Sequence, residues 1–162
     1  MLKAWISIVL FVSVATSALA ESSAAKPNFV LVAQDLHLET KQTRTAYYVD
    51  FSSIGPDKEE PRYISMKVAT RYLLDPQDFR GKKLLSEILI NLYDCSNNRS
   101  KAIEVEQYST DFPSPSSVIY KSVRPTAQNG GFMDLWNEPP QSVPFQTLHS
   151  IACGKLKRKD FK

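Results

Sequence analysis

The sequence has few of the residues on which active sites usually depend. Its 162 residues include two cysteines, two histidines and five glycines. Two cysteines with the distant His37 and His149 do not form a zinc-binding pattern, and no Cys-x-x-Cys redox pair is present. The Gly-x-Ser-x-Gly, His-Glu-x-x-His and phosphate-binding glycine-loop motifs are also missing. The sequence therefore predicts no metal site, no cofactor and no enzymatic activity.

The one long hydrophobic run lies in the first twenty residues, which predict a cleaved signal peptide. Lys3 precedes an apolar stretch over residues 5–14, and Ala18-Leu19-Ala20 fits the small-residue cleavage pattern. An uncleaved anchor is the alternative, but the stretch is shorter than the roughly 20 residues that a membrane-spanning helix needs. The residue after the cleavage site is Glu21 rather than the cysteine of a bacterial lipid anchor. We expect a soluble exported protein, either periplasmic or secreted to the cell surface.

The remaining chain divides into a leader, one domain and a tail. Residues 21–27 are a Ser- and Ala-rich leader that we expect to be disordered, and residues 28–154 have a length typical of a single domain. Both cysteines, Cys95 and Cys153, lie in this domain. An exported chain meets an oxidising compartment, so one disulfide between them is predicted, with two free thiols as the alternative.

Residues 81–95 are predicted to form one long strand at the centre of the domain. Alternate side chains of a strand share a face. One face is apolar and carries Leu84, Ile88, Ile90 and Leu92. The other face is mixed and carries Leu85, Glu87, Leu89, Asn91, Tyr93 and Cys95. A helix is the alternative. The β-branched and aromatic residues of the second half favour a strand in an antiparallel sheet, with one face of the sheet partly exposed to water.

Further elements follow from the same kind of alternation. Strands are predicted over residues 28–34, 46–50, 62–73, 101–110 and 117–123. A short turn of helix is expected at residues 52–54 and a short apolar segment at residues 132–136. Loops are expected at residues 56–61 and 75–81. The acidic loop at residues 56–61 is interpreted as a solvated turn rather than a cation site.

A helix is predicted near the C-terminus. Ser142 is its expected N-cap, Pro144 lies in its first turn and Gly154 ends it. Its apolar face consists of Phe145, Leu148, Ile151 and Ala152. Because short loops join the strands, the sequence predicts an α+β fold with an antiparallel meander of about six strands. We expect the helix to pack on the apolar face of the sheet, held by the disulfide.

A set of residues spread over most of the chain resembles the surface-adhesin protein E family of exported bacterial proteins. The set comprises Tyr47-Tyr48-Val49-Asp50 with Ser52-Ser53-Ile54, Tyr93-Asp94-Cys95 with Arg99, Tyr108, Trp136 and Val143-Pro144. The resemblance implies a small antiparallel sheet, a C-terminal helix and a disulfide. It also implies a role at the cell envelope, where the family's namesake looks like an adhesin for host extracellular-matrix and serum proteins.

The tail at residues 155–162 is the first candidate binding surface. The whole chain has a formal net charge of +3, and this tail carries five basic residues against Asp160. Its candidate contact residues are Lys155, Lys157, Arg158 and Lys159. Long-range attraction would bring it to lipopolysaccharide, anionic lipid, heparan-type sugars or nucleic acid, with no specificity for nucleic acid predicted. A flexible solubilising terminus is the alternative.

Three tyrosines form the second candidate surface. Tyr63, Tyr93 and Tyr108 are predicted to lie on the mixed face of the sheet, where exposed rings would offer a more specific contact. Cross-strand pairs that stabilise the sheet are the alternative interpretation. An unprotected edge strand would also allow a homodimer by strand addition.

Side chains that suggest catalysis have simpler interpretations. His149 and Cys153 are four residues apart on the helix, but Cys153 is expected in the disulfide. Asp50 and Asp94 follow tyrosines near strand ends, where a carboxylate most often caps a turn. The sequence thus predicts a non-enzymatic binding module. The resemblance to the protein E family implies that it is an adhesin-like protein of the bacterial envelope that binds host extracellular-matrix or serum proteins. A soluble periplasmic accessory protein is the alternative, and a hydrolase with a site built from strand ends is a minor third.

Overall fold

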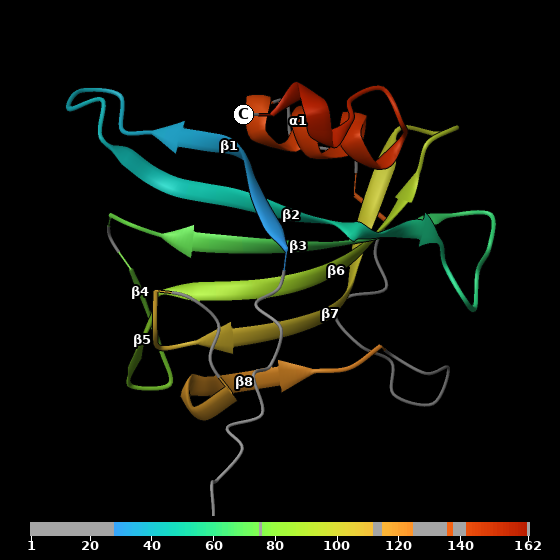
Figure 1. Cartoon of the computed structure of the whole chain (residues 1–162). Helices are drawn as coiled ribbons and strands as arrows, with labels where there is room; N and C mark the ends of the chain where they lie inside the picture. Colours follow the sequence, from blue (N-terminus) through green and yellow to red (C-terminus); the bar gives the residue numbers. More distant parts are fainter. Residues whose placement is uncertain (1–27, 75, 112–114, 125–135, 138–141, 162) are drawn as a thin grey trace, which may run out of the picture.

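The computed structural model describes residues 28–74, 76–111, 115–124, 136–137 and 142–161. Its centre is a six-stranded antiparallel sheet in the order β1-β2-β3-β6-β7-β8 (Figure 1). The strands are β1 (Phe29–Leu36), β2 (Thr43–Pro56), β3 (Ile64–Tyr72), β6 (Ser86–Asp94), β7 (Arg99–Tyr108) and β8 (Val118–Ser122). The predicted antiparallel α+β fold is confirmed. The expected signal peptide, the leader and residues 132–135 lie outside the described residues.

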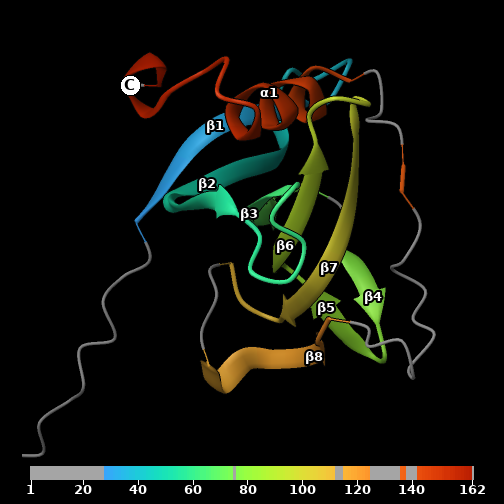
Figure 2. The same ribbon diagram turned by 90° about the vertical axis from the view of Figure 1, so that its right-hand side faces the viewer.

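Three helical elements complete the described chain. The α-helix α1 (Val143–Ala152) begins after Ser142 and is followed by Gly154 at a φ of 73°, as the sequence predicts. The short 3₁₀ turns are η1 (Pro115–Ser117) before β8 and η2 (Arg158–Asp160) in the basic tail. Figures 1 and 2 show α1 lying across the end of the sheet formed by β1, β2 and β3.

The predicted long strand over residues 81–95 is divided in two. Its first part is β5 (Lys82–Leu84), which pairs with β4 (Gln77–Phe79) in a separate hairpin where a loop was expected. Arg80 and Gly81 join the two strands with φ values of 51° and 74°, the backbone of a tight hairpin turn. The main-sheet strand β6 begins only at Ser86. The expectation of one continuous strand is therefore wrong, because this hairpin turn draws the first part into its own pairing.

The expected turn of helix at residues 52–54 is also wrong, since β2 continues through it to Pro56. The pairing of β2 with β3 is irregular between Asp50 and Gly55. Local side-chain bonds hold this irregular segment. The Asp50 carboxylate accepts the N–H of Ser52 at 3.0 Å, and the Ser53 hydroxyl accepts the N–H of Lys67 at 2.9 Å. A bulged strand thus replaces the helical turn.

The helix packs on the mixed face of β6 rather than on its apolar face, which corrects the prediction. Tyr93 lies in the main core with residues of β2, β3 and α1: Val49, Met66, Val68, Leu148, Ile151 and Ala152. Cys95 has the same parity as Tyr93, and its disulfide to Cys153 places α1 on that side, with the two Cα atoms 5.6 Å apart. The predicted disulfide is therefore present and selects the packed face.

The apolar face of β6 has its own smaller core. Leu92 packs there with Tyr63 and Ile103, and Ile90 and Trp136 lie against them. Both faces of the sheet are thus covered near β6, so the apolar residues on each face of this strand pack against other side chains. Hydrophobic burial of this kind contributes roughly 25 cal/mol per Å² of apolar surface removed from water.

Candidate functional site

The basic tail is docked onto the domain. Leu156 and Phe161 pack against the main core, and the Phe161 ring lies 6.0 Å from that of Phe51. The Lys157 N–H donates to the Asp160 carboxylate at 2.7 Å, which closes the η2 turn. The Arg158 guanidinium donates to the side-chain oxygen of Asn28 at 3.1 Å. The alternative of a flexible terminus does not fit this packing.

Four cations are displayed on this docked segment, which we call the basic terminus. Its members Lys155, Lys157, Arg158 and Lys159 are all exposed. Within the described residues, none of the four forms an ion pair with a carboxylate. Their charges are therefore available to an external anion, while the turn beneath them is held by apolar contacts.

The three candidate tyrosines are buried, which contradicts the exposure on which that surface depends. Tyr63, Tyr93 and Tyr108 are each only 4 to 5% exposed. Tyr93 contacts His149, Tyr63 contacts Trp136, and the Tyr108 hydroxyl donates to the carboxylate of Glu106. Burial raises the pKa of Tyr93, so its phenol stays neutral. Their visible role is packing within the sheet and its covering layers.

Trp136 lies on the face of the sheet that carries Leu92, close to Arg99, which also belongs to the set of residues that resembles the protein E family. Its ring lies 4.5 Å from that of Tyr63, and the charged ends of Arg99 and Lys101 lie 4.9 and 5.0 Å from its centroid. Cations at such distances are attracted to the negative face of an indole. Arg99 also donates to the Asp94 carboxylate at 3.0 Å. The cluster ties the segment at Trp136 to the start of β7.

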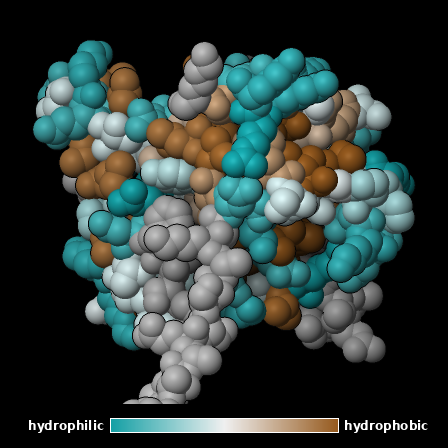
Figure 3. Space-filling model, in the orientation of Figure 1, coloured by the Kyte–Doolittle hydropathy of each residue, from teal (hydrophilic) through white to brown (hydrophobic). Residues whose placement is uncertain are grey.

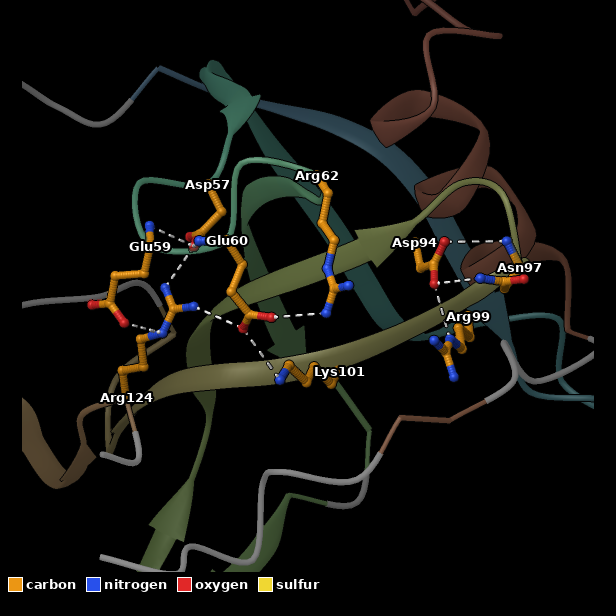
Figure 4. A network of polar contacts seen from close by, with 9 residues as sticks. All are labelled: Asp57, Glu59, Glu60, Arg62, Asp94, Asn97, Arg99, Lys101 and Arg124. Carbon is orange, nitrogen blue, oxygen red and sulfur yellow. Dashed lines mark hydrogen bonds and ion pairs between the residues drawn. The ribbon is translucent and has the colours of Figure 1, made fainter. Parts of the chain in front are cut away.

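The acidic turn after β2 is held by a cation from a distant part of the chain (Figure 4). The Arg124 guanidinium lies 2.7 Å from Asp57, 3.0 Å from Glu59 and 3.1 Å from Glu60. Lys101 adds a contact of 3.5 Å to Glu60. The interpretation of a wholly solvated turn is thus wrong for Asp57, which is 7% exposed. No group of three metal-ligating side chains occurs among the described residues.

Electrostatics at Asp57 follow from this arrangement. Burial by itself would raise the pKa of the carboxyl. The Arg124 guanidinium and the main-chain N–H groups of Glu60 and Glu59 outweigh burial and lower the pKa below its ordinary value of 3.8. The charged carboxylate is therefore the stable form. This is the behaviour of a structural ion-pair cluster rather than of a general acid.

The side chains that suggested catalysis have structural contacts instead. Cys153 is bonded to Cys95, so the His149 ring, 3.7 Å from its Sγ atom, has no thiol to activate. The Asp94 carboxylate accepts the N–H of Asn97 at 3.2 Å, and Asp50 holds its own bulge. Asp94 thus caps the turn after β6, as the sequence indicated, whereas Asp50 holds an irregular segment within β2.

Apolar side chains are also exposed near β1 and α1. Figure 3 shows hydrophobic surface gathered in the upper half of this view, the part where Figure 1 places those elements. The exposed large apolar residues of these two elements are Leu31, Leu36, Val143 and Phe145. No local sequence pattern groups these residues, because β1 and α1 are separated by most of the chain.

Comparison with known proteins assigns the family. A sequence profile of the surface-adhesin protein E family matches residues 36–154. This chain belongs to that family. The structure of crystal form II of Haemophilus influenzae protein E is similar at 13% identity and a TM-score of 0.46, covering 85% of this chain and 95% of that one. Another structure of Haemophilus influenzae protein E has 14% identity, a TM-score of 0.43, and coverages of 79% and 95%. Among curated proteins, none matches the sequence.

Membership of the surface-adhesin protein E family supports a binding role at the surface for this chain and its export from the cell. The part of the chain that the structure describes contains no helix long and apolar enough to cross a membrane. Of the two surfaces expected from the sequence, the basic terminus is exposed and the tyrosines are not. The basic terminus is therefore the candidate site that the geometry favours.

Proposed function

We propose that this chain is an exported, non-enzymatic adhesin that binds anionic groups of host extracellular-matrix or serum proteins through its basic terminus. The observation that carries the proposal is the docking of residues 154–161. Leu156 and Phe161 are anchored in the core while four cations between them and beside them remain exposed. Acidic protein segments and sulfated sugars carried by matrix proteins have the complementary charge.

Docking of the segment matters for affinity as well as for position. A free terminus loses conformational entropy when it binds, at roughly 1–2 kcal/mol per backbone residue that becomes fixed. Here much of that cost is met when the domain folds, because the η2 turn and the Phe161 contact already fix the backbone. Preorganisation of this kind raises affinity without adding contacts.

Removal of the four positive charges gives the direct test. The mature chain is measured for binding to immobilised heparin and to purified matrix and serum proteins over a range of salt. We expect alanine replacement of Lys155, Lys157, Arg158 and Lys159 to abolish salt-sensitive binding, because attraction between exposed charges is screened over about 8 Å at physiological salt. The charge-matched control replaces four exposed lysines elsewhere: Lys41, Lys58, Lys82 and Lys83. Equal losses in both variants would overturn the proposal.

The alternative is a soluble periplasmic accessory protein with no host ligand. It shares the fold and the docked terminus, so only its location and its partners distinguish it. Such a protein would show no salt-sensitive binding to host components and would be enclosed by the outer membrane. Localisation in intact cells therefore separates the two functions independently of the binding assay.

Pairing of two copies through a sheet edge stays a prediction. The strands β1 and β8 lie at the two edges of the main sheet, and each is paired on one side within the chain. An edge strand can accept another strand through its free main-chain groups. Sedimentation at increasing protein concentration tests this pairing, and a constant monomer mass would contradict it.

A further inference from the structure

A cavity of about 140 Å³ lies between the sheet and α1, which contributes Phe145, Leu148 and His149 to its lining. Its walls include rings and aliphatic side chains from β2, β3, β6 and α1: Tyr47, Tyr72, Leu89, Phe145 and Leu148. One carboxylate, that of Glu87, is also in the lining. For comparison, an apolar cavity of about 150 Å³ in another protein is large enough to bind benzene. The cavity therefore suits a ligand with a small apolar body.

Sheet register explains why these side chains meet. Tyr47 is directly opposite Thr70, and Thr70 is directly opposite Glu87, so the three form a row across β2, β3 and β6. Side chains in such a row point to the same face of the sheet. Phe145 reaches this row from α1, with its ring centroid 5.8 Å from that of Tyr47 in an edge-to-face contact. Phe145 is still 39% exposed, which places an aromatic ring at the border between cavity and solvent.

Glu87 differs from Asp57 and Asp94 in having no cation beside it. Asp57 pairs with Arg124, and Asp94 pairs with Arg99. The contacts of Glu87 are neutral: the Tyr72 hydroxyl donates to it at 2.6 Å, and the Gln107 amide donates at 3.4 Å. Among the described residues, no lysine, arginine or histidine forms an ion pair with Glu87.

The phenols of Tyr47 and Tyr72 remain neutral beside this carboxylate. Burial and the charge of Glu87 raise the pKa of Tyr72, and burial together with Asp35 and Glu87 raises the pKa of Tyr47. Tyr72 therefore stays protonated and donates a hydrogen bond to the Glu87 carboxylate. Neither ring carries a negative charge of its own, so the single anionic group in the lining is Glu87.

From this geometry we infer that the cavity is a binding site for a small organic ammonium ion with an apolar body. The negative faces of aromatic rings attract cations, and a desolvated site strengthens that attraction. A charge-assisted hydrogen bond to the free lone pairs of Glu87 would fix the ammonium group. The apolar body would then fill the space beside Leu89 and Leu148. This site is separate from the basic terminus and does not depend on the proposed adhesive function.

The test compares two probes of nearly equal shape, benzylammonium and the neutral benzyl alcohol, by NMR titration of the mature protein. Benzylammonium should produce saturable shifts of the Tyr47, Glu87 and Phe145 resonances, with an affinity at least about ten-fold higher than that of the alcohol. A factor of ten corresponds to about 1.4 kcal/mol of binding free energy. Equal affinity for the two probes, or no saturable shift, would overturn the inference.

Two glutamine variants separate the role of Glu87 from a general change in charge. Glu87→Gln keeps an oxygen that accepts from Tyr72, and it should lower benzylammonium affinity about ten-fold and remove the preference over the alcohol. Glu104→Gln is the matched control, because Glu104 lies opposite Ile90 and thus on the other face of the sheet. It should leave both affinities unchanged. The spectrum of each variant reports directly whether the domain is folded, and unchanged benzylammonium binding by folded Glu87→Gln would contradict the assignment.

Discussion

Tyr93 of β6 lies against His149 of α1, with their ring centroids 6.0 Å apart, next to the disulfide between Cys95 and Cys153, the residues that directly follow these two elements. This contact shows how the helix is held. Tyr93 and Cys95 are two residues apart at the end of β6, and His149 and Cys153 are four residues apart at the end of α1. One covalent and one packing contact therefore fix α1 on the same face of the sheet.

Removal of the disulfide should destabilise the domain without changing its fold. The bond closes a loop with a sequence separation of 58 residues. The entropic estimate for such a loop is about 4 kcal/mol of unfolding free energy. We expect the Cys95→Ser, Cys153→Ser double variant to lose about that amount in urea unfolding. A loss below about 1 kcal/mol would show that Tyr93 and its neighbours suffice to hold α1.

Stability should fall as the solution becomes mildly acidic, because His149 is buried. Burial lowers its pKa below the ordinary value of 6.5, the Lys155 charge lowers it further, and Asp94 partly opposes the shift. Below pH 6.5 the unfolded state therefore binds a proton that the folded state resists, so the free energy of unfolding decreases until the folded-state pKa is passed.

The measurement is urea unfolding between pH 7.5 and pH 5 of the wild-type chain and of His149→Gln. The glutamine variant should lose the part of the slope that begins near pH 6.5, whatever its stability at neutral pH. If both proteins showed the same pH dependence, another group would be responsible and the assignment to His149 would be wrong.

Replacement of Arg124 by alanine should be costly. It leaves the buried Asp57 and the neighbouring Glu59 and Glu60 without their shared cation. Breaking a buried ion pair typically costs about 3–5 kcal/mol, and we expect the lower end because Arg124 is partly exposed. Arg62→Ala is the control. Its side chain is 75% exposed at 3.9 Å from Glu60, so its loss should stay below about 1 kcal/mol.

Loss of the Phe161 ring should release the basic terminus while leaving the main sheet folded. Burial of a phenylalanine contributes up to about 1.5–3 kcal/mol, and partial burial here predicts about a ten-fold increase in opening of the segment. Limited trypsin digestion of Phe161→Ser should therefore cut within residues 155–159 about ten-fold faster than in wild type. Val123→Ser, at a residue that is 61% exposed, should leave the rate unchanged. Equal rates for both variants would contradict the docking.

Much of this fold follows from local patterns in the sequence. Alternation located the main strands, Ser142 and Gly154 bounded α1, and the cysteine count predicted the disulfide. The prediction of the face on which α1 packs is wrong because it rests on which face of β6 has more apolar residues. Cys95 shares the other face with Tyr93, and its disulfide holds α1 there. The break near Leu85 depends on pairing within the β4-β5 hairpin, which single-strand periodicity does not reveal.

The sites were harder to predict because they depend on contacts distant in sequence. Arg124 contacts Asp57, which lies 67 residues earlier in the sequence, and no local pattern distinguishes Arg124 from the other arginines of the chain. Tyr63, Tyr93 and Tyr108 were misplaced because a tyrosine on a mixed strand face is compatible with solvent or with a covering layer. Glu87 is recognised as a candidate only from the strand register, which places it opposite Thr70 and in a row with Tyr47. Its lack of a neighbouring cation is likewise visible only in the folded chain.

The central claim, that this chain acts as an adhesin outside the cell, is tested most directly by protease accessibility on intact cells. A periplasmic marker protein in the same cells controls for leakage of the outer membrane. The account predicts that external trypsin digests this protein while the marker stays intact. Protection of both proteins would place the chain in the periplasm and contradict the adhesive function.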